Sequence, residues 1–311
     1  MTTPADAQAL RSRVLLLPVD ACHLVYLAGT LVLVLTHLDS VPRAGMWTAV
    51  SVVLLAVAAL VPLVARRMSE RGGSMLRLVQ TVATIPLVFT ELGSLVPYVR
   101  LRRFEKELFE FDCRLFGGSE PLAMLGRLEN PWLTEALQWV YNYYFFIPVI
   151  LGVAVVRRDR PRDLLRMLFV CSLCIYLSYL GYYAVPASGP NIDRLGLYAF
   201  SDELRGVFMT REFRSAIAAV EQIKQDCFPS GHTAVSIVAL LLAYRFARRT
   251  VPVLWPLVVA LVFSTMYLRY HYVADVLAGV ALAFVADRAG TALHLHWERR
   301  RGWGNIDEIA S

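Results

Sequence analysis

Long apolar blocks, separated by short polar segments, dominate the pattern of this chain. Most blocks are close to the length of about 20 residues with which a helix crosses the hydrocarbon core of a bilayer. The pattern therefore predicts an all-α integral membrane protein, a polytopic helical bundle of about eight transmembrane helices. The predicted spans are residues 21–38, 45–65, 75–98, 132–156, 163–185, 230–248, 251–269 and 272–296.

Two longer connections are predicted to carry interfacial helices. In the first, residues 99–131, apolar side chains recur at helical spacing between charges and stop at Gly117. This amphipathic pattern is typical of a helix lying in the plane of the membrane surface. In the second, residues 186–229, a turn rich in proline precedes a short charged segment at 209–224, which we expect to form another surface helix.

Composition and charge agree with membrane insertion. The 311 residues are 57% hydrophobic and 18% charged, which is more apolar than a soluble domain. The net charge of +6 does not indicate a nucleic-acid partner, because arginines cluster in the short alternate connections that the positive-inside rule assigns to the cytoplasm. We therefore expect a plasma (inner) membrane protein with both termini in the cytoplasm and the two longer loops outside.

The domain organisation follows from the spans. No cleavable signal peptide is evident, so the first span is expected to insert the chain. Residues 1–70 are expected to form an N-terminal two-helix membrane extension, because their spans carry no ionisable residue in their middles. Residues 71–298 are expected to form the catalytic membrane domain, and residues 299–311 a cytoplasmic tail.

The five cysteines are too few for a disulfide framework. Cys171 and Cys174 are expected to pack between helices as small polarizable side chains. Cys113 and Cys227 both fall in predicted outward loops, where they either form a disulfide or stay free. The sequence alone does not show whether their Cα atoms lie within bonding distance.

The stretch from Phe228 to Thr233 places His232 at the start of a predicted span. Pro229 suits the first turn of a helix, and the residues after it present backbone N–H groups at a helix N-terminus, which binds anions. Gly231 allows a phosphate to approach the backbone closely. The pattern predicts a phosphate site with a histidine beside it; the alternative is a capped helix with an incidental histidine.

The stretch from Tyr267 to Asp275 carries His271 four residues before an aspartate. This spacing places both on one face of a helix, where the carboxylate fixes the ring tautomer and makes the other ring nitrogen a better nucleophile. Arg269 is a candidate for binding phosphate oxygens. The alternative is an interfacial belt of tyrosine, histidine and arginine, but an aspartate in the first turn of an apolar span is costly unless it is paired.

Topology joins the two stretches. His232 and His271 open spans that start on the same side of the membrane, so one shared site at the outer face is expected. Two histidines, one of them oriented by Asp275, suffice to move a phosphoryl group through a covalent phosphohistidine.

The two stretches also resemble a known family. The run Pro229-Ser230-Gly231-His232, followed 39 residues later by His271 and then Asp275, is similar to the type-2 phosphatidic acid phosphatase superfamily of membrane enzymes. The resemblance covers about 75–290. Additional marks resemble the inositol phosphorylceramide synthase-like branch; they are His271-Tyr272, Tyr182-Tyr183 before the Pro186–Pro190 turn, and Asp112 followed by Leu115-Phe116-Gly117 and Pro121.

The resemblance implies a six-helix catalytic core and a role for each residue. His271 matches the nucleophile and Asp275 the carboxylate that orients it. His232 matches the general acid for the leaving group, while Ser230 and Gly231 match the phosphate cradle. The resemblance implies neither a metal nor another cofactor.

The chain departs from the family pattern where basic residues are expected. Thr265 stands six residues before His271, where the family has an arginine, and the first family signature is absent. Arg269, one helical turn further on, is expected to supply this charge. Asn191 follows Pro190 where related chains have a basic residue. The candidates to complete the cradle are Arg194 or one of Arg100, Arg102 and Arg103.

These observations predict a metal-independent membrane enzyme that transfers a phosphoryl or phospho-head group from a lipid phosphate through a phosphohistidine on His271. Water is the expected acceptor, which makes the chain a lipid phosphatase. The alternative is a head-group transferase with a lipid alcohol as acceptor, as in inositol phosphorylceramide synthesis. A transporter or scaffold with a decayed site is disfavoured by the intact His232, His271 and Asp275. The pattern leaves the oligomeric state open.

Overall fold

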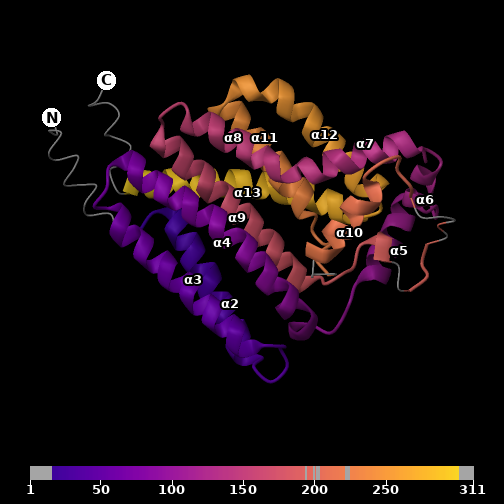
Figure 1. Ribbon diagram of the computed structural model, residues 1–311, viewed down its shortest axis with the longest axis horizontal. Coiled ribbons are helices and arrows are strands. Elements are labelled where there is room, and N and C mark those ends of the chain that lie inside the picture. Colours follow the sequence, from indigo (N-terminus) through magenta and orange to yellow (C-terminus); the bar gives the residue numbers. More distant parts are fainter. Residues whose placement is uncertain (1–15, 193–194, 199, 201–203, 221–224, 301–311) are drawn as a thin grey trace. The chain divides into compact units, whose positions relative to one another are not determined.

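The computed structural model describes residues 16–192, 195–198, 200, 204–220 and 225–300, and every regular element in this part of the chain is a helix (Figure 1). The predicted all-α membrane fold is therefore confirmed. Six of these helices are long and apolar enough to cross a membrane. They are α2 (Pro18–Thr36), α3 (Ala44–Ala65), α4 (Glu70–Val99), α9 (Pro161–Ala184), α12 (Val251–Tyr267, preceded by the short helix η3, Arg248–Thr250) and α13 (Val273–Arg300).

Two of the eight predicted spans differ from a single long helix. The span predicted at 132–156 is a pair of helices, α7 (Pro131–Asn142) and α8 (Phe146–Val156), bent by 46° about the short helix η1 (Tyr143–Phe145). The span predicted at 230–248 is α11 (Gly231–Phe246), an apolar helix of 16 residues. At 1.5 Å per residue it is about 24 Å long, less than the roughly 30 Å of a hydrocarbon core.

The chain forms two compact units. One contains the residues up to Val88, Val155–Leu173 and the residues from Val285 onward; the other contains Phe89–Ala154 and Cys174–Phe284. Helices α4, α8, α9 and α13 contribute residues to both units. The sequence predicts a catalytic domain at residues 71–298. That boundary concerns activity and not compactness, so it stays a prediction.

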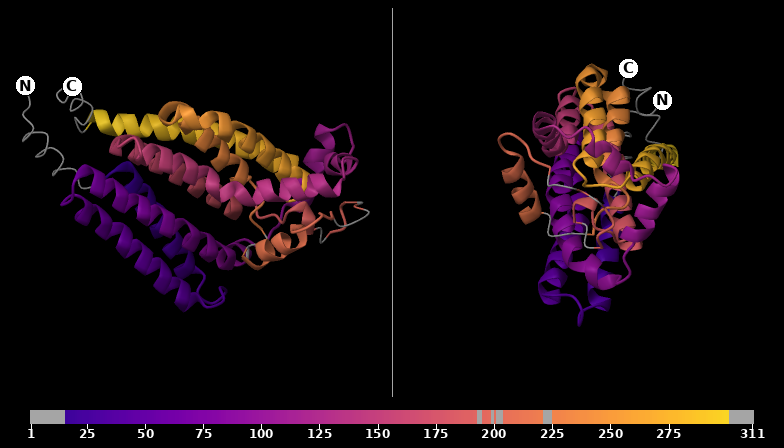
Figure 2. Two further views of the ribbon diagram at one scale, coloured as in Figure 1. Left: turned by 45° about the horizontal axis from the view of Figure 1, so that its top comes forward. Right: turned by 90° about the vertical axis from the view of Figure 1, so that its right-hand side faces the viewer.

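Helices α2 and α3 form a hairpin in the first unit and run side by side in Figures 1 and 2. A buried ion pair holds this hairpin to α4: Arg77 donates from Nε and Nη2 to the two carboxylate oxygens of Asp20, both at 2.8 Å. His23 Nε2 lies 3.0 Å from the Thr81 hydroxyl beside this pair. The hairpin is therefore attached to α4 by polar contacts between buried side chains.

In the second unit, α12 packs against both α7 and α11. The helix predicted in the first long connection is α5 (Glu105–Leu115), which starts later than its apolar pattern suggested. Its placement in the plane of the membrane surface stays a prediction. Its end is the expected glycine stop, because Gly117 and Gly118 have φ of 64° and 89° and the Gly118 N–H donates to the carbonyl of Cys113 at 2.7 Å. The short helix α6 (Pro121–Gly126) follows it.

A buried carboxylate holds the second predicted surface helix, α10 (Thr210–Val220). Glu135 of α7 accepts the N–H groups of Val207, Phe208, Met209 and Thr210 and the hydroxyl of Thr210, at 2.7–3.2 Å. A carboxylate at a helix N-terminus satisfies N–H groups that have no partner within the helix. Glu135 therefore ties α10 and the loop before it to α7.

Candidate active site

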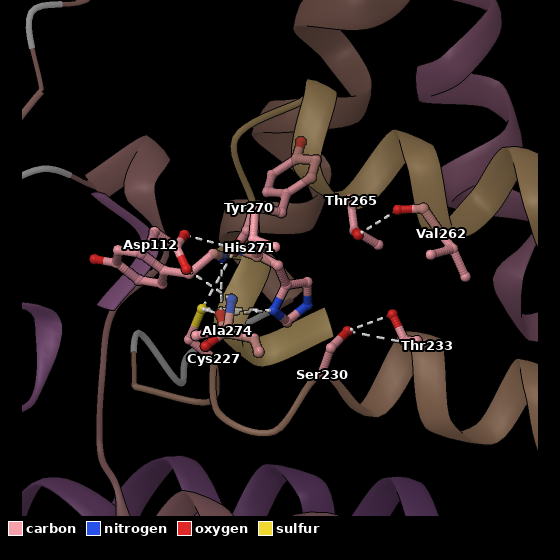
Figure 3. Close-up of polar contacts among 12 residues, drawn as sticks. Asp112, Cys227, Ser230, Thr233, Val262, Thr265, Tyr270, His271 and Ala274 are labelled. Carbon is pink, nitrogen blue, oxygen red and sulfur yellow. Dashed lines mark hydrogen bonds and ion pairs between the residues drawn. The ribbon is translucent and has the colours of Figure 1, made fainter. Parts of the chain in front are cut away.

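His271 and Asp275 face one another, although not through helical spacing. Helix α13 begins at Val273, so His271 lies before it and only Asp275 is in its first turn. The expectation of a shared helix face was wrong. Instead, the N–H groups of Tyr270 and His271 both donate to the carbonyl of Thr265, at 2.9 and 3.1 Å. This turn places His271 Nδ1 3.4 Å from Asp275 Oδ2, and Nε2 is the ring nitrogen on the other side (Figure 3).

The carboxylate of Asp275 is fully buried and its two oxygens differ. Oδ2 accepts the backbone N–H of Tyr272 at 2.9 Å and the thiol of Cys227 at 2.6 Å, and it is the oxygen that faces His271. Oδ1 is buried with no hydrogen-bond partner. A carboxylate beside Nδ1 fixes the tautomer with the proton on that nitrogen, which leaves the lone pair on Nε2.

His232 lies in the same site, as the shared topology predicted. It is in the first turn of α11, and its ring centroid is 5.8 Å from that of His271 in an edge-to-face arrangement. Two tyrosine rings from the α7–η1 region enclose it. Tyr141 stacks on His232 at 4.7 Å, and the ring of Tyr144 lies at 4.4 Å.

Ser230 caps α11 and connects it to α13. Its hydroxyl accepts the N–H of Thr233 at 3.3 Å, and its own N–H donates to the carbonyl of Asp275 at 3.0 Å. Pro229 therefore precedes the cap, and the expectation that it occupies the first turn was wrong. The N–H of Ser230 is already bonded to the carbonyl of Asp275 in α13. The N–H groups of Gly231 and His232, at the start of α11, have no partner within the helix.

Gly231 and Gly279 permit the close packing of these segments. A Cβ on Gly231 would lie 2.5 Å from the hydroxyl oxygen of Tyr182, and one on Gly279 would lie 2.6 Å from the carbonyl of Ser230. Real Cβ contacts are not this short. A side chain at either position would push α11 away from α9 or α13, so these glycines hold the two histidine segments together.

Asp112 of α5 accepts the first two N–H groups of α13, from Val273 at 2.7 Å and from Ala274 at 2.8 Å (Figure 3). It is fully buried, and burial raises the pKa of its carboxyl to about 6 although both hydrogen bonds lower it. The sequence marked Asp112 only as part of a family pattern. Its contact with α13 joins residues far apart in the chain and leaves no local signal.

Cys227 is also part of the site. It and Cys113 are both free, so the disulfide that remained open from the sequence is not formed. Burial and the neighbouring Asp275 raise the pKa of the Cys227 thiol, which keeps its proton and donates it to Oδ2. The ligand atoms of Cys227, His271 and Asp275 lie within 4.8 Å of one another, which makes them the residues here that could hold a metal.

The basic residue expected at the phosphate is paired with another group. The guanidinium of Arg269 binds the carboxylate of Glu129 and lies 3.9 Å above the ring of Phe200, and the residue is 8% exposed. Thr265, at the position of the family arginine, is buried and donates its hydroxyl to the carbonyl of Val262 at 2.8 Å.

The other arginine candidates contact other groups or lie outside the described residues. Arg194 lies outside them. Arg103 lies 3.9 Å from the carboxylate of Glu105. Arg102 pairs with Glu107 at 2.8 Å, and both Arg100 and Arg102 lie over the ring of Phe104. Sequence reasoning missed Arg214 on α10, whose guanidinium lies 5.9 Å from the ring centre of Tyr270. The sequence signal that could have indicated Arg214 was its position in the charged segment 209–224, which was predicted to form a surface helix.

The site therefore presents one histidine with an oriented carboxylate, a second histidine across from it, and a helix N-terminus between α9 and α13. A family model described as the PAP2 superfamily matches residues 106–289, more than half of the chain, and this match includes both histidine segments. No curated protein and no solved structure matches the chain significantly. The chain belongs to the type-2 phosphatidic acid phosphatase (PAP2) superfamily of phosphatases and phosphotransferases.

Proposed function

We propose that this membrane protein transfers the phosphoryl group of a lipid phosphate through a phosphohistidine on His271. The observation that carries the proposal is the placement of His232 with its ring centre 5.8 Å from that of His271, while Asp275 lies beside Nδ1 of His271. This arrangement leaves Nε2 of His271 to act as nucleophile. A second histidine beside the nucleophile is in a position to serve as acid and base.

In the first step, the Nε2 lone pair of His271 attacks phosphorus, and the bond from phosphorus to the lipid oxygen breaks. The electron pair stays on that oxygen, which takes a proton from His232, so the lipid leaves as an alcohol. The imidazole becomes a cation when the P–N bond forms. The negative charge of Asp275 beside Nδ1 stabilises that cation.

In the second step, His232, now neutral, removes a proton from water. The water oxygen attacks phosphorus, the P–N bond breaks, and its electron pair returns to Nε2 of His271. Inorganic phosphate leaves and His232 is protonated again. No step written here uses a metal ion.

The phosphate is proposed to bind at the start of α11. The amides of Gly231 and His232 head this helix, and a helix N-terminus favours an anion. Ser230 contributes by capping the helix that presents these amides. Arg269 is proposed to add positive charge by sharing its N–H groups between Glu129 and the phosphate.

A lipid substrate is supported by the placement of the site. Both histidines lie at the ends of apolar helices, α11 and α13, within an integral membrane protein. A lipid whose chains lie between apolar helices would bring its phosphate to this level without leaving the bilayer.

The rings of Tyr141 and Tyr144 favour head-group transfer as a second candidate function. They enclose His232, the group that must remove a proton from the acceptor. An apolar wall at that place excludes water and accommodates a lipid alcohol. In this variant the donor is a phosphodiester lipid. Its head group stays bonded to phosphorus, so His271 carries the phospho-head group after the diacyl alcohol leaves. The lipid hydroxyl then attacks phosphorus in place of water and gives a new phosphodiester, as in the inositol phosphorylceramide synthase-like branch.

The test is a product assay on the purified full chain with mixed lipid donors and acceptors. Release of inorganic phosphate supports the phosphatase, and a new phosphodiester lipid supports the transferase. His271→Ala should abolish either product, whereas His296→Ala, at an exposed histidine, should leave the rate unchanged. Full activity of His271→Ala would overturn the proposal.

We also propose that the site faces outward, with both termini in the cytoplasm of a plasma (inner) membrane protein. The arginine-rich alternate connections support this orientation. A membrane-impermeant maleimide should label Leu101→Cys in intact cells, but Arg67→Cys only after permeabilisation, above the labelling of the native cysteines. The reverse pattern would contradict the orientation.

A further inference from the structure

We infer that Cys227, His271 and Asp275 form a zinc-binding site whose occupation switches the proposed enzyme off. The inference rests on the proposed function for its effect on activity, but the binding itself does not depend on that function.

The three side chains supply ligands that suit zinc. A thiolate, an imidazole nitrogen and a carboxylate oxygen together form a donor set typical of Zn²⁺, whereas Mg²⁺ and Ca²⁺ prefer oxygen ligands alone. The three ligand atoms, Sγ of Cys227, Nδ1 of His271 and Oδ2 of Asp275, lie within 4.8 Å of one another. All three residues are buried, which excludes competing water ligands from most directions.

Two of the three separations already match a tetrahedral zinc site. Zinc–ligand bond lengths place sulfur and nitrogen about 3.6 Å apart and nitrogen and oxygen about 3.3 Å apart at tetrahedral angles. The observed separations are 3.5 Å between Cys227 Sγ and His271 Nδ1 and 3.4 Å between His271 Nδ1 and Asp275 Oδ2. The third, 2.6 Å between Cys227 Sγ and Asp275 Oδ2, is a hydrogen bond that must open by about 1 Å.

A second observation points to a ligand at this place. Asp275 is fully buried, and its Oδ1 has no hydrogen-bond partner. A buried carboxylate oxygen ordinarily has one. Such an oxygen can take part in binding the metal or can accept a hydrogen bond from a zinc-bound water. Tyr272 N–H, 2.9 Å from Oδ2, supplies the hydrogen bond that orients a metal-binding carboxylate.

Zinc binding replaces the thiol proton by the metal. The S–H bond of Cys227 breaks, the sulfur keeps the electron pair and donates it to Zn²⁺, and the proton leaves to solvent. Nδ1 of His271 donates its lone pair to the metal, and its proton moves to Nε2. Water completes the four ligands.

This change removes the nucleophile. With Asp275 beside Nδ1, the lone pair of neutral His271 lies on Nε2. With zinc on Nδ1, the single proton of the neutral ring lies on Nε2, which then has no lone pair in the ring plane to attack phosphorus. Asp275 is also bound to the metal and no longer stabilises the imidazolium. Zinc therefore holds His271 in the tautomer that cannot react.

The direct test measures zinc-65 binding by equilibrium dialysis on the full chain, purified in detergent without a histidine tag. We expect one high-affinity Zn²⁺ per chain, with no competition from excess Mg²⁺. Cys227→Ala should raise the dissociation constant at least about tenfold. Cys113→Ala, which removes the other outward-loop cysteine, should not change it. Equal zinc affinity of Cys227→Ala and the natural chain would overturn the inference.

X-ray absorption on the zinc-loaded natural chain keeps the inference testable if Cys227→Ala does not fold. One sulfur at about 2.3 Å with nitrogen or oxygen ligands at about 2.0 Å is expected, and a spectrum without sulfur would overturn the site. In the activity assay, zinc at saturation should stop turnover and a chelator should restore it. A chain that binds zinc but never turns over a phosphate ester contradicts the proposed function alone; an active chain that binds no zinc contradicts only this inference.

Discussion

Oδ2 of Asp112, on α5, lies 2.7 Å from the backbone nitrogen of Val273, the first residue of α13. This contact ties a surface helix to the segment that carries His271 and Asp275. Asp112→Ala removes both acceptors at the start of α13, and a small displacement of a reacting group is costly. We expect kcat to fall about 10–100-fold with KM changed less than about twofold.

The control for Asp112 is Glu110→Ala on the same helix. Glu110 is partly exposed and pairs with Arg114 at 3.0 Å, so its loss should change kcat little. Steady-state kinetics on both variants, with folding checked by size-exclusion chromatography, test whether Asp112 positions the site. Equal kcat values for the two variants would show that Asp112 does not position the site.

The carboxyl of Asp112 also predicts how stability depends on pH. Burial raises its pKa in the folded chain to about 6 from an ordinary value of 3.8. The folded chain therefore binds more protons than the unfolded chain between these values, so stability is lost as pH rises from about 4 to about 6. The melting temperature of the natural chain should fall relative to that of Asp112→Asn across this window and run parallel to it above pH 7. A constant difference from pH 4 to 7 would contradict the raised pKa.

The contact between Gly231 and Tyr182 predicts a paired effect. A Cβ at position 231 would lie 2.5 Å from the Tyr182 hydroxyl oxygen but 3.8 Å from the ring carbon that bears it. Gly231→Ala should destabilise the fold by about 1–3 kcal/mol through overpacking. Tyr182→Phe removes the oxygen in contact, so the double variant should recover part of this loss. Thermal unfolding of both single variants and the double variant measures the coupling, and additive losses would exclude the contact.

Two ion pairs of the first unit should contribute differently to the free energy of unfolding. Arg77 and Asp20 form a buried pair at 2.8 Å, whereas Arg71 and Asp159 form a pair at 3.4 Å with both side chains exposed. Arg77→Met leaves a buried carboxylate unpaired and should cost about 3–5 kcal/mol, while Arg71→Met should cost less than about 1 kcal/mol. Similar melting temperatures for the two variants would contradict the burial of the first pair.

The sequence predicted the helices better than their interruptions. Six of the eight spans predicted from apolar length are single long helices in the described residues. Apolar length does not show that α7 and α8 are separated by a 46° bend or that α11 stops after 16 residues. The start of α11 depends on the cap at Ser230, whose N–H donates to a carbonyl of α13.

In the site, local motifs predicted His232, His271 and Asp275, and the structure places the three side chains together. The turn before α13, and not helical spacing, brings His271 to Asp275. The surrounding residues were not predictable in the same way. Asp112 and Cys227 reach Asp275 or α13 from distant parts of the chain. Arg269 pairs with Glu129, which is 140 residues away in the sequence. The position of Arg269 beside the histidine motif therefore did not indicate this partner.

The covalent phosphohistidine on Nε2 of His271 is the central claim. The most direct measurement is to mix the purified chain with a lipid phosphate labelled with ³²P, quench within milliseconds in alkali, which preserves phosphohistidine, and identify the labelled peptide. The account predicts label on the peptide that contains His271, present in His296→Ala and absent in His271→Ala. Label on any other residue, or equal labelling of His271→Ala, would contradict it.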